Sequence, residues 1–187
     1  MNLRSLGIDR SWTLFLDRDG VINRRIVNGY VRNWEEFEFL PGVTGALALL
    51  APVFSRIIVV SNQQGVGKGL MTHADVDAIH HRMTEEVARA GGRFDAVYFA
   101  PFLATDRSVM RKPGIGMALR ARREFPGVRF RYSLMAGDSL SDMQFGKRAG
   151  MTTVLIADQP SLARAWPSLI DFRVPDLEAL AQTIIPG

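Results

Sequence analysis

The chain has 187 residues, of which 47% are hydrophobic and 22% are charged. This length and composition predict one folded domain over residues 1–187, and they exclude disordered, coiled-coil and collagen-like proteins. The absence of cysteine excludes disulfides, thiolate metal sites and cysteine nucleophiles. The formal net charge of +4 is compatible with binding of anions, from a small phosphate ester to a nucleic acid.

Neither a targeting signal nor a membrane span is visible. The first residues, MNLRSLGIDRSW, lack the apolar centre of a secretory signal, and the apolar runs are too short to cross a bilayer. We therefore expect a cytoplasmic protein without a membrane partner. Basic residues cluster only at 120–123 and 129–131, without the interleaved aromatic residues of a nucleic-acid motif, so we interpret both clusters as solvated faces and expect no nucleic-acid partner.

Short apolar runs alternate with amphipathic segments, a pattern typical of a parallel sheet covered by helices. The nearly continuous apolar character of these runs indicates burial on both faces. We therefore expect an α/β fold with a doubly wound, Rossmann-like parallel sheet and helices on both of its faces. The expected strands are 13–16, 56–60, 96–100, 132–137 and 152–156, and the expected helices are 43–50, 72–90 with Thr72 as N-cap, 113–125, 139–150 and 175–184.

The least regular segment, residues 23–40, lies between the first strand and the first helix. Irregular segments of this length inside a compact domain are often functional. We expect a β-hairpin flap over the end of the first strand, with Trp34 placed to cover a bound substrate.

Two carboxylates follow the first expected strand in the sequence LFLDRDGVIN. Asp17 and Asp19 stand at i and i+2, so on extended backbone they point the same way, and their crowded charges need a cation or a shared proton. A carboxylate at a strand end can act as a nucleophile or hold a hard cation. Asp-Arg-Asp-Gly is also favourable turn chemistry, so these residues alone leave both interpretations open.

The second expected strand runs into VVSNQQGVGKG. Ser61 and Asn62 stand at the strand end, where a hydroxyl and free backbone N–H groups suit a phosphate oxygen. The glycine spacing matches neither the P-loop nor the dinucleotide-binding fingerprint. A phosphate-binding loop and an ordinary loop are both compatible with this segment alone.

Two further charged groups occupy comparable positions. Arg111 and Lys112 precede Pro113, where two cations could neutralise an anionic substrate, although exposed Arg-Lys pairs are ordinary. Asp138 and Asp142 follow a strand and share one helical face, where they could repel each other, cap the helix or coordinate a cation. Capping explains one of these two carboxylates but not both.

All four groups follow expected parallel strands, whose carboxyl ends meet in one crevice. The order of carboxylate pair, hydroxyl, lysine and carboxylate pair resembles the motif order of the haloacid dehalogenase superfamily of phosphohydrolases, over residues 14–158. Within that superfamily, the chain most resembles the D-glycero-D-manno-heptose 1,7-bisphosphate and histidinol-phosphate phosphatases. The matching strings are FLDRDGVIN, GYV with FEFLPGV, VVSNQQGVGKG, RKPGIGM and GDSLSDMQFGKRAG.

This resemblance implies a magnesium-dependent phosphomonoesterase that forms an aspartyl-phosphate intermediate. Asp17 would attack phosphorus, and Asp19 would act as general acid and then general base, a role that requires a raised pKa. The substrate would be held by four residues: Ser61 and Lys112 on the phosphoryl oxygens, and Asn62 and Arg111 on the rest of the molecule.

The implied Mg²⁺ would bind the side chains of Asp17 and Asp138 and the backbone carbonyl of Asp19. Asp142 would bind directly, through water, or as a partner of a ligand. The family usually carries a zinc-binding loop of Cys and His before the Arg-Lys-Pro motif, but APFLATDRSVM contains neither, so we expect no zinc. Ser139 stands where many heptose enzymes have lysine. Because of these two departures from the family pattern, the resemblance does not identify the substrate.

The segments between the four motifs are too short for a large cap domain, so we expect an uncapped monomer that acts on a small phosphorylated substrate. A sugar phosphate such as D-glycero-D-manno-heptose 1,7-bisphosphate fits best. Histidinol phosphate, another small phosphate ester and a nucleic-acid 3′ end are the alternatives. A phosphorylated receiver-like signalling domain is an alternative of another class, against which Asp19 argues because receivers lack an acid/base residue there.

Overall fold

The computed structural model describes residues 3–157 and 165–185. Its centre is a six-stranded, fully parallel sheet in the order β3-β2-β1-β4-β5-β6. The strands are β1 Thr13–Leu16, β2 Arg56–Asn62, β3 Ala96–Ala100, β4 Ser133–Gly137, β5 Thr152–Ile156 and β6 Phe172–Val174. The chain therefore reverses its direction of growth across the sheet between β1 and β4, which is where open α/β sheets bind ligands.

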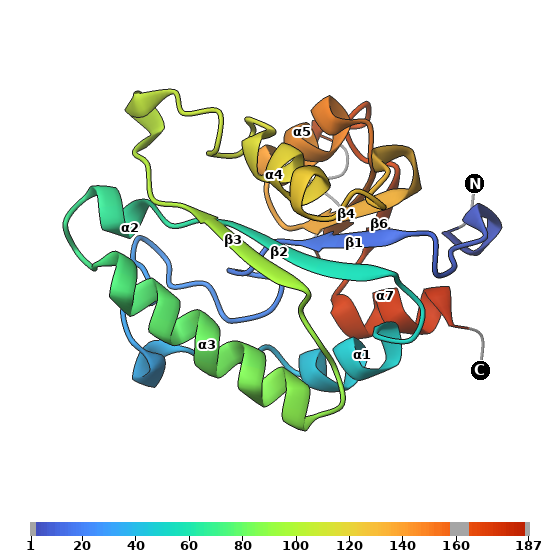
Figure 1. Cartoon of the computed structure of the whole chain (residues 1–187), viewed down its shortest axis with the longest axis horizontal. Coiled ribbons are helices and arrows are strands. Elements are labelled where there is room, and N and C mark those ends of the chain that lie inside the picture. Colours follow the sequence, from blue (N-terminus) through green and yellow to red (C-terminus); the bar gives the residue numbers. More distant parts are fainter. Residues whose placement is uncertain (1–2, 158–164, 186–187) are drawn as a thin grey trace.

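Helices cover both faces of the sheet, as Figure 1 shows, with α4 and α5 on one side and α1, α3 and α7 on the other. A hydrophobic core lies on each face of the sheet, and neighbouring residues of β1 contribute to different cores. Leu14 and Leu16 pack toward α1 and α3, whereas Phe15 packs toward α4 and α5. This alternation explains why β1 is apolar throughout. The helices are α1 Val43–Leu50, α2 Gln64–Gly67, α3 His73–Arg89, α4 Gly116–Glu124, α5 Leu140–Ala149 and α7 Leu177–Ile184.

The expected doubly wound fold is confirmed, and so are its five strands within a residue or two at their ends. Thr72 caps α3 as expected, in a reciprocal capping box with Asp75. The described residues between the motifs hold loops, helices and strands of the sheet, and no cap domain. The expected motif range ends at Asp158, which lies outside the described residues. None of the described helices combines the length and the hydrophobicity that a membrane span requires.

The structure differs from the expected elements in three places, namely the starts of two helices and one additional strand. The helix expected from Pro113 begins at Gly116, because residues 109–116 form turns closed by the N–H of Gly114 on Arg111 O and that of Gly116 on Val109 O. The helix expected from Pro175 begins at Leu177, after the N-cap Asp176. Strand β6 was not expected, since its three residues are too short to show a periodicity.

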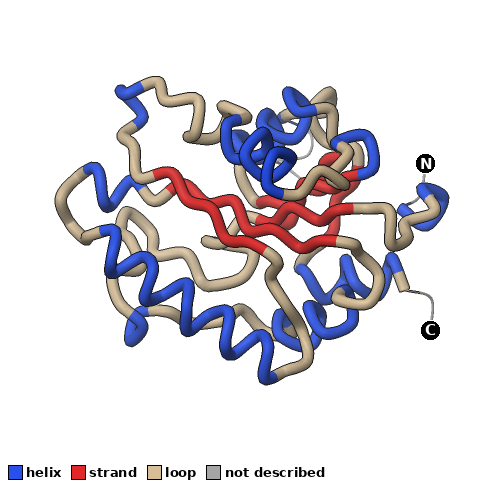
Figure 2. The backbone as a smooth tube through the Cα atoms, viewed as in Figure 1, coloured by secondary structure: helices blue, strands red, loops and turns tan. Residues whose placement is uncertain are grey.

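The segment 23–40 is not a hairpin. Figure 2 shows it as loop apart from one short helical turn, Trp34–Glu36, and its only ladder contacts in the described chain are isolated bridges at Asn23. Trp34 does not cover the strand end. It stacks on Phe37 with ring centroids 4.8 Å apart and lines a different pocket beside α3. The aromatic residue of this segment that reaches the carboxyl end of the sheet is Tyr30.

Candidate active site

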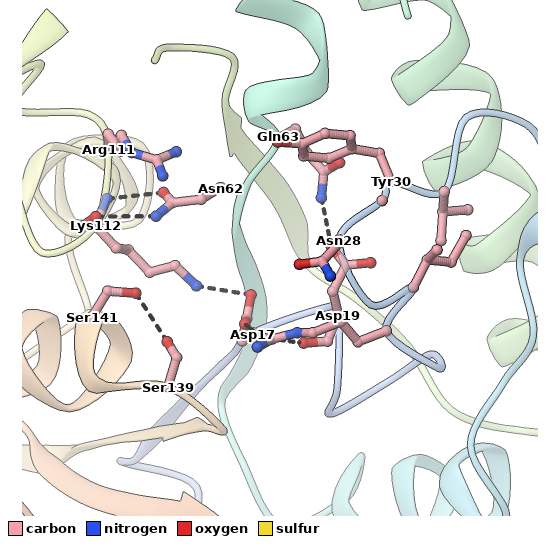
Figure 3. A pocket seen from close by; sticks show the side chains of 14 residues that line it. Asp17, Asp19, Asn28, Tyr30, Asn62, Gln63, Arg111, Lys112, Ser139 and Ser141 are labelled. Carbon is pink, nitrogen blue, oxygen red and sulfur yellow. Dashed lines mark hydrogen bonds and ion pairs between the residues drawn. The ribbon is translucent and has the colours of Figure 1, made fainter. Parts of the chain in front are cut away.

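The carboxyl ends of β1, β2 and β4 surround a pocket of about 340 Å³ (Figure 3). Five of the expected site residues line it, namely Asp17, Asp19, Asn62, Arg111 and Lys112. The loop after β1 contributes Arg25, Asn28 and Tyr30, β2 is continued by Gln63, and Ser139 and Ser141 come from the start of α5. Ser61, Asp138 and Asp142 lie beside these residues without lining the pocket themselves.

Asp17 continues β1, with its N–H donating to Ala136 O of β4 over 3.0 Å. Its carboxylate is almost fully buried, and Oδ1 accepts hydrogen bonds from Lys112 Nζ and from the N–H of Arg18, each over 2.8 Å. Burial and the charge of Asp142 raise the pKa of Asp17 to about 6, although Lys112 acts in the opposite direction. The carboxylate is therefore fixed in orientation and strongly dependent on nearby positive charge.

Lys112 is a buried cation with three partners. Its Nζ donates to Asp17 Oδ1 over 2.8 Å and to Val60 O over 2.7 Å, and it forms an ion pair of 2.6 Å with Asp142 Oδ1. Burial alone would lower the pKa of Lys112, but the charges of Asp142 and Asp17 outweigh it and raise the pKa. Lys112 is therefore an ammonium ion held between two carboxylates.

Asn62 holds the backbone that carries Lys112. The N–H of Lys112 donates to Asn62 Oδ1 over 2.9 Å, and Asn62 Nδ2 donates to Lys112 O over 3.0 Å. Figure 3 shows this reciprocal pair beside Arg111. Because the amide oxygen and nitrogen of Asn62 are both engaged, the side chain ties the end of β2 to the loop before α4.

Asp19 accepts three hydrogen bonds from neighbouring side chains. Arg18 NH2 donates over 2.8 Å, Asn23 Nδ2 over 3.0 Å and Gln63 Nε2 over 2.7 Å. Burial would raise the pKa of Asp19, but the Arg18 charge and these hydrogen bonds outweigh it and lower the pKa. The expected upward shift is therefore wrong for the free protein, because no sequence pattern revealed how many donors surround this carboxylate.

Gln63, which lines the pocket, is hydrogen-bonded to Ser61 beside it. Gln63 Nε2 donates to Ser61 Oγ as well as to Asp19, over 2.7 Å in each case. Ser61 is only 1% exposed, at the end of β2. Gln63 was not predicted as a site residue, since a glutamine in a glycine-rich loop gives no chemical signal by itself.

Arg18, between the two aspartates, is completely buried. One of its terminal nitrogens contacts Asp19 and the other lies 3.2 Å from His80 Nε2 of α3. Burial, followed by the Arg18 charge, lowers the pKa of His80 to about 3, so the imidazole is neutral and accepts from the guanidinium. This contact joins α3 to the site.

The candidate metal centre consists of Asp17, Asp138 and Asp142, each of which offers one oxygen within 4.8 Å of the others. Burial and the charge of Asp17 raise the pKa of Asp138 to about 8. Gly20 makes the close approach possible: its φ is +92°, and a Cβ there would lie 1.9 Å from Asp138 Oδ2. A hard cation with oxygen ligands, such as Mg²⁺, suits this donor set.

A positive group already contacts part of this centre. Arg25 NH2 lies 2.6 Å from Asp138 Oδ1 and 3.0 Å from the backbone oxygen of Asp19. Asp142 is the least available ligand, because Lys112 pairs with its Oδ1 and its Oδ2 accepts from the N–H of Ser139 over 3.0 Å. The residues therefore fit a divalent cation held mainly by Asp17, Asp138 and the Asp19 carbonyl.

A parallel α/β sheet with two aspartates after its first strand, a buried lysine and a carboxylate pair at the same edge defines the haloacid dehalogenase class of hydrolases. A family model described as "HAD-hyrolase-like" matches residues 109–180. The D-glycero-alpha-D-manno-heptose-1,7-bisphosphate 7-phosphatase of Mycobacterium bovis is 46% identical over 133 residues, which cover 71% of this chain and 70% of that protein. The corresponding enzyme of Burkholderia mallei is 39% identical over 154 residues, covering 78% and 80% of the two chains.

Solved structures agree with this class. The D,D-heptose 1,7-bisphosphate phosphatase from B. bronchiseptica, solved with magnesium and phosphate, superposes with a TM-score of 0.82 at 30% identity, over 92% of this chain and 97% of that one. The chain belongs to the D-glycero-D-manno-heptose-1,7-bisphosphate 7-phosphatase family of the haloacid dehalogenase superfamily.

Proposed function

We propose that the chain removes the 7-phosphate of D-glycero-D-manno-heptose 1,7-bisphosphate in a magnesium-dependent reaction through an aspartyl-phosphate. The proposal rests on the hydrogen bond of 2.8 Å from Lys112 Nζ to Asp17 Oδ1, in a pocket that Asp19 also lines. Relatives at 45–46% identity are named for the α anomer, and we therefore propose the α anomer as substrate. At 33–37% identity there are relatives named for either anomer.

Asp17 is the nucleophile in this proposal. A carboxylate oxygen of Asp17 attacks phosphorus, the bond from phosphorus to the sugar oxygen breaks, and water later releases phosphate from the aspartyl ester. Lys112 Nζ donates hydrogen bonds to Asp17 Oδ1 and Val60 O and forms an ion pair with Asp142 Oδ1. It therefore orients Asp17, and its positive charge acts on the phosphoryl group.

Asp19 gives a proton to the leaving sugar oxygen and later takes one from water. Its lowered pKa makes it ionised in the free protein, and an anionic phosphoryl group brought beside it favours the protonated form. Substrate binding and protonation of Asp19 are therefore coupled. Arg18, Asn23 and Gln63 keep the carboxylate in one orientation throughout.

The side chains of Asp17 and Asp138 and the Asp19 carbonyl would hold Mg²⁺. When bound, this ion neutralises charge on the transferring phosphoryl oxygens. Asp142 supports the centre through Lys112 and the start of α5 rather than as a direct ligand. No zinc is expected, since the segment before Arg111 offers no thiolate or imidazole.

The remaining site residues hold the substrate. Ser61, beside the pocket, has its hydroxyl proton available for a phosphoryl oxygen, because its Oγ already accepts from Gln63. Arg111, with its guanidinium on the pocket wall, meets the anionic or polyhydroxyl end of the substrate. Asn62 contributes through the position of Lys112. The monomeric state and the cytoplasmic location stay predictions from the sequence.

A panel of phosphate esters tests the proposal. Phosphate release would be measured from the α and β heptose bisphosphates, histidinol phosphate and a 3′-phosphorylated oligonucleotide, each with Mg²⁺ and with a chelator. We expect the highest kcat/KM for the α heptose bisphosphate and none without Mg²⁺. Preference for histidinol phosphate or the oligonucleotide would contradict the substrate, and full activity with a chelator would contradict the metal dependence.

A further inference from the structure

Arg25 lines the pocket, and the proposed reaction gives it no role. It lies in the irregular segment after β1, and its NH2 contacts Asp138 Oδ1 at 2.6 Å, Asp19 O at 3.0 Å and Asp17 Oδ2 at 3.9 Å. These are the same three groups that the proposed metal centre uses. A guanidinium and a divalent cation therefore draw on one set of oxygens.

Arg25 NH2 stands where the metal would bind. A metal-bound carboxylate oxygen can still accept a hydrogen bond, but Mg²⁺ requires ligand oxygens at about 2.1 Å in near-octahedral geometry. The one nitrogen NH2 lies within 3.9 Å of Asp138 Oδ1, Asp19 O and Asp17 Oδ2, and so takes up the space that an ion bound to these oxygens would fill. Positive charges this close also repel each other strongly in a partly buried site. Binding of the metal must move Arg25 away from Asp138.

Arg25 is free to make this movement. Its side chain is 48% exposed, and it belongs to no helix or strand. Within the described residues its hydrogen bonds both come from NH2 and go to Asp138 Oδ1 and Asp19 O, so leaving the centre breaks no hydrogen bond outside it. By contrast, the cation Lys112 is 1% exposed and held on three sides. Of these two cations, Arg25 is the one that is placed to exchange.

We propose that Arg25 is an internal counter-cation that competes with the metal for Asp17, Asp138 and the Asp19 carbonyl, and that metal binding releases it to become a phosphate-binding residue of the pocket. The released guanidinium stays on the wall that it shares with Arg111. Arginine is suited to this second task, because its planar donors match phosphate oxygens. The metal thus prepares the pocket for an anion in two ways, by its own charge and by freeing Arg25. The inference rests on the proposed metal site.

Isothermal titration of Mg²⁺ into the wild type, Arg25→Gln and Arg24→Gln tests the competition without any turnover. Arg24 is the matched control, since it is the adjacent residue and pairs with exposed Glu38 instead of the acidic centre. We expect Arg25→Gln to bind Mg²⁺ more tightly by about fivefold or more, in the range of ordinary coupling between two ligands, and Arg24→Gln to match the wild type. Arg25→Lys, which keeps the charge, should lie close to the wild type.

A second titration tests the released state. With Mg²⁺ saturating, inorganic phosphate should bind Arg25→Gln more weakly by about tenfold, the worth of one charge-assisted hydrogen bond, and Arg24→Gln normally. In a thermal melt, Arg25→Gln should lower Tm in the presence of a chelator and leave Tm unchanged with Mg²⁺.

Three outcomes would overturn all or part of the inference, and they are distinguishable. If Mg²⁺ binds Arg25→Gln as tightly as the wild type or more weakly, Arg25 does not compete, while the proposed metal site stands. If Mg²⁺ binds none of the proteins, the metal site and the proposed function fail together with the inference. If Arg25→Gln binds phosphate as tightly as the wild type, Arg25 is not a phosphate-binding residue, and that half of the proposal is overturned.

Discussion

Lys112 Nζ lies 2.8 Å from Asp17 Oδ1, although 95 positions separate the two residues in the chain. Asp142 pairs with the same nitrogen at 2.6 Å, so one buried ammonium ion joins β1, the loop before α4 and the start of α5. This contact links three of the four sequence motifs. It is a structural support of the sheet edge and, in the proposed reaction, the group that orients the nucleophile.

Replacement of Lys112 by Met should destabilise the protein. The change leaves Asp17 and Asp142 buried without their cation, which costs about 3–5 kcal/mol when a buried pair is broken. Lys147→Met is the control, because Lys147 pairs with Asp171 near the surface, where ion pairs are worth about 0–1 kcal/mol. Urea unfolding with a chelator present would measure both, and an equal loss in the two variants would contradict this role of Lys112.

Asn62→Ala should impair catalysis through the position of Lys112. The substitution removes two hydrogen bonds to the Lys112 backbone, worth about 1–3 kcal/mol together. If Asn62 only contacted substrate, KM alone would rise. We expect kcat to fall as well, and the effects of Asn62→Ala and Lys112→Met on kcat to be non-additive in a double-mutant cycle. A change confined to KM would favour the direct contact instead.

Gly20→Ala should weaken metal binding. A Cβ at this position would lie 1.9 Å from Asp138 Oδ2, so Asp138 has to move. Loss of a correctly placed ligand should reduce Mg²⁺ affinity by about tenfold or more, comparable with changes that disturb metal ligands elsewhere. Gly7→Ala is the control for backbone strain, because Gly7 also has a positive φ but a Cβ there meets nothing within 4 Å. Titration of both variants with Mg²⁺ would compare them, and equal affinities would count against the placement of Asp138.

His80 should contribute stability that is lost as the pH falls below neutral. The native state holds His80 neutral with a pKa of about 3, whereas in the unfolded chain it binds a proton near pH 6.5. The unfolded chain therefore binds more protons at this residue, and acidification from pH 7 to pH 5 should remove about 2 kcal/mol that His80 contributes to the free energy of unfolding. The raised pKa values of Asp17 and Asp138 act in the opposite direction, so the His80 contribution is the difference between wild type and a His80 variant.

Variants of two neighbouring histidines distinguish the contribution of His80 to the pH dependence of stability from that of other residues. His80→Gln keeps an acceptor for Arg18 but cannot take up a proton, so its stability should be less sensitive to acid. His81→Gln should behave like the wild type, because His81 is 75% exposed and paired only with Glu85. Unfolding of the three proteins at pH 5 and pH 7 measures the difference. The same loss in His80→Gln as in the wild type would rule out His80 as its source.

Much of the fold and of the site follows from the sequence. The apolar runs of β1 and β2 and the cap at Thr72 are local signals, so the sheet and α3 could be predicted. The gathering of Asp17, Lys112 and Asp138 followed from one general property of parallel sheets, whose carboxyl ends share an edge.

What could not be predicted depends on side chains from distant elements. The pKa of Asp19 is set by donors such as Arg18 and Gln63, and a buried arginine next to two aspartates looks in the sequence like an ordinary surface residue. Trp34 was expected over the site, but the packing of Phe37 and Phe39 against it decides its place. The contact of Arg25 with Asp138 spans 113 positions and leaves no local pattern.

The most direct test of the account is the identification of the residue that carries the phosphoryl group. Enzyme mixed with the heptose bisphosphate and Mg²⁺ would be quenched in acid within a single turnover, and its peptides mapped by mass spectrometry. The account predicts a phosphoryl group on Asp17 of the wild type, and a folded Asp17→Asn variant that carries no adduct and loses turnover by about 10³-fold or more, as for other nucleophile deletions. An adduct on another residue, or undiminished turnover by Asp17→Asn, would contradict it.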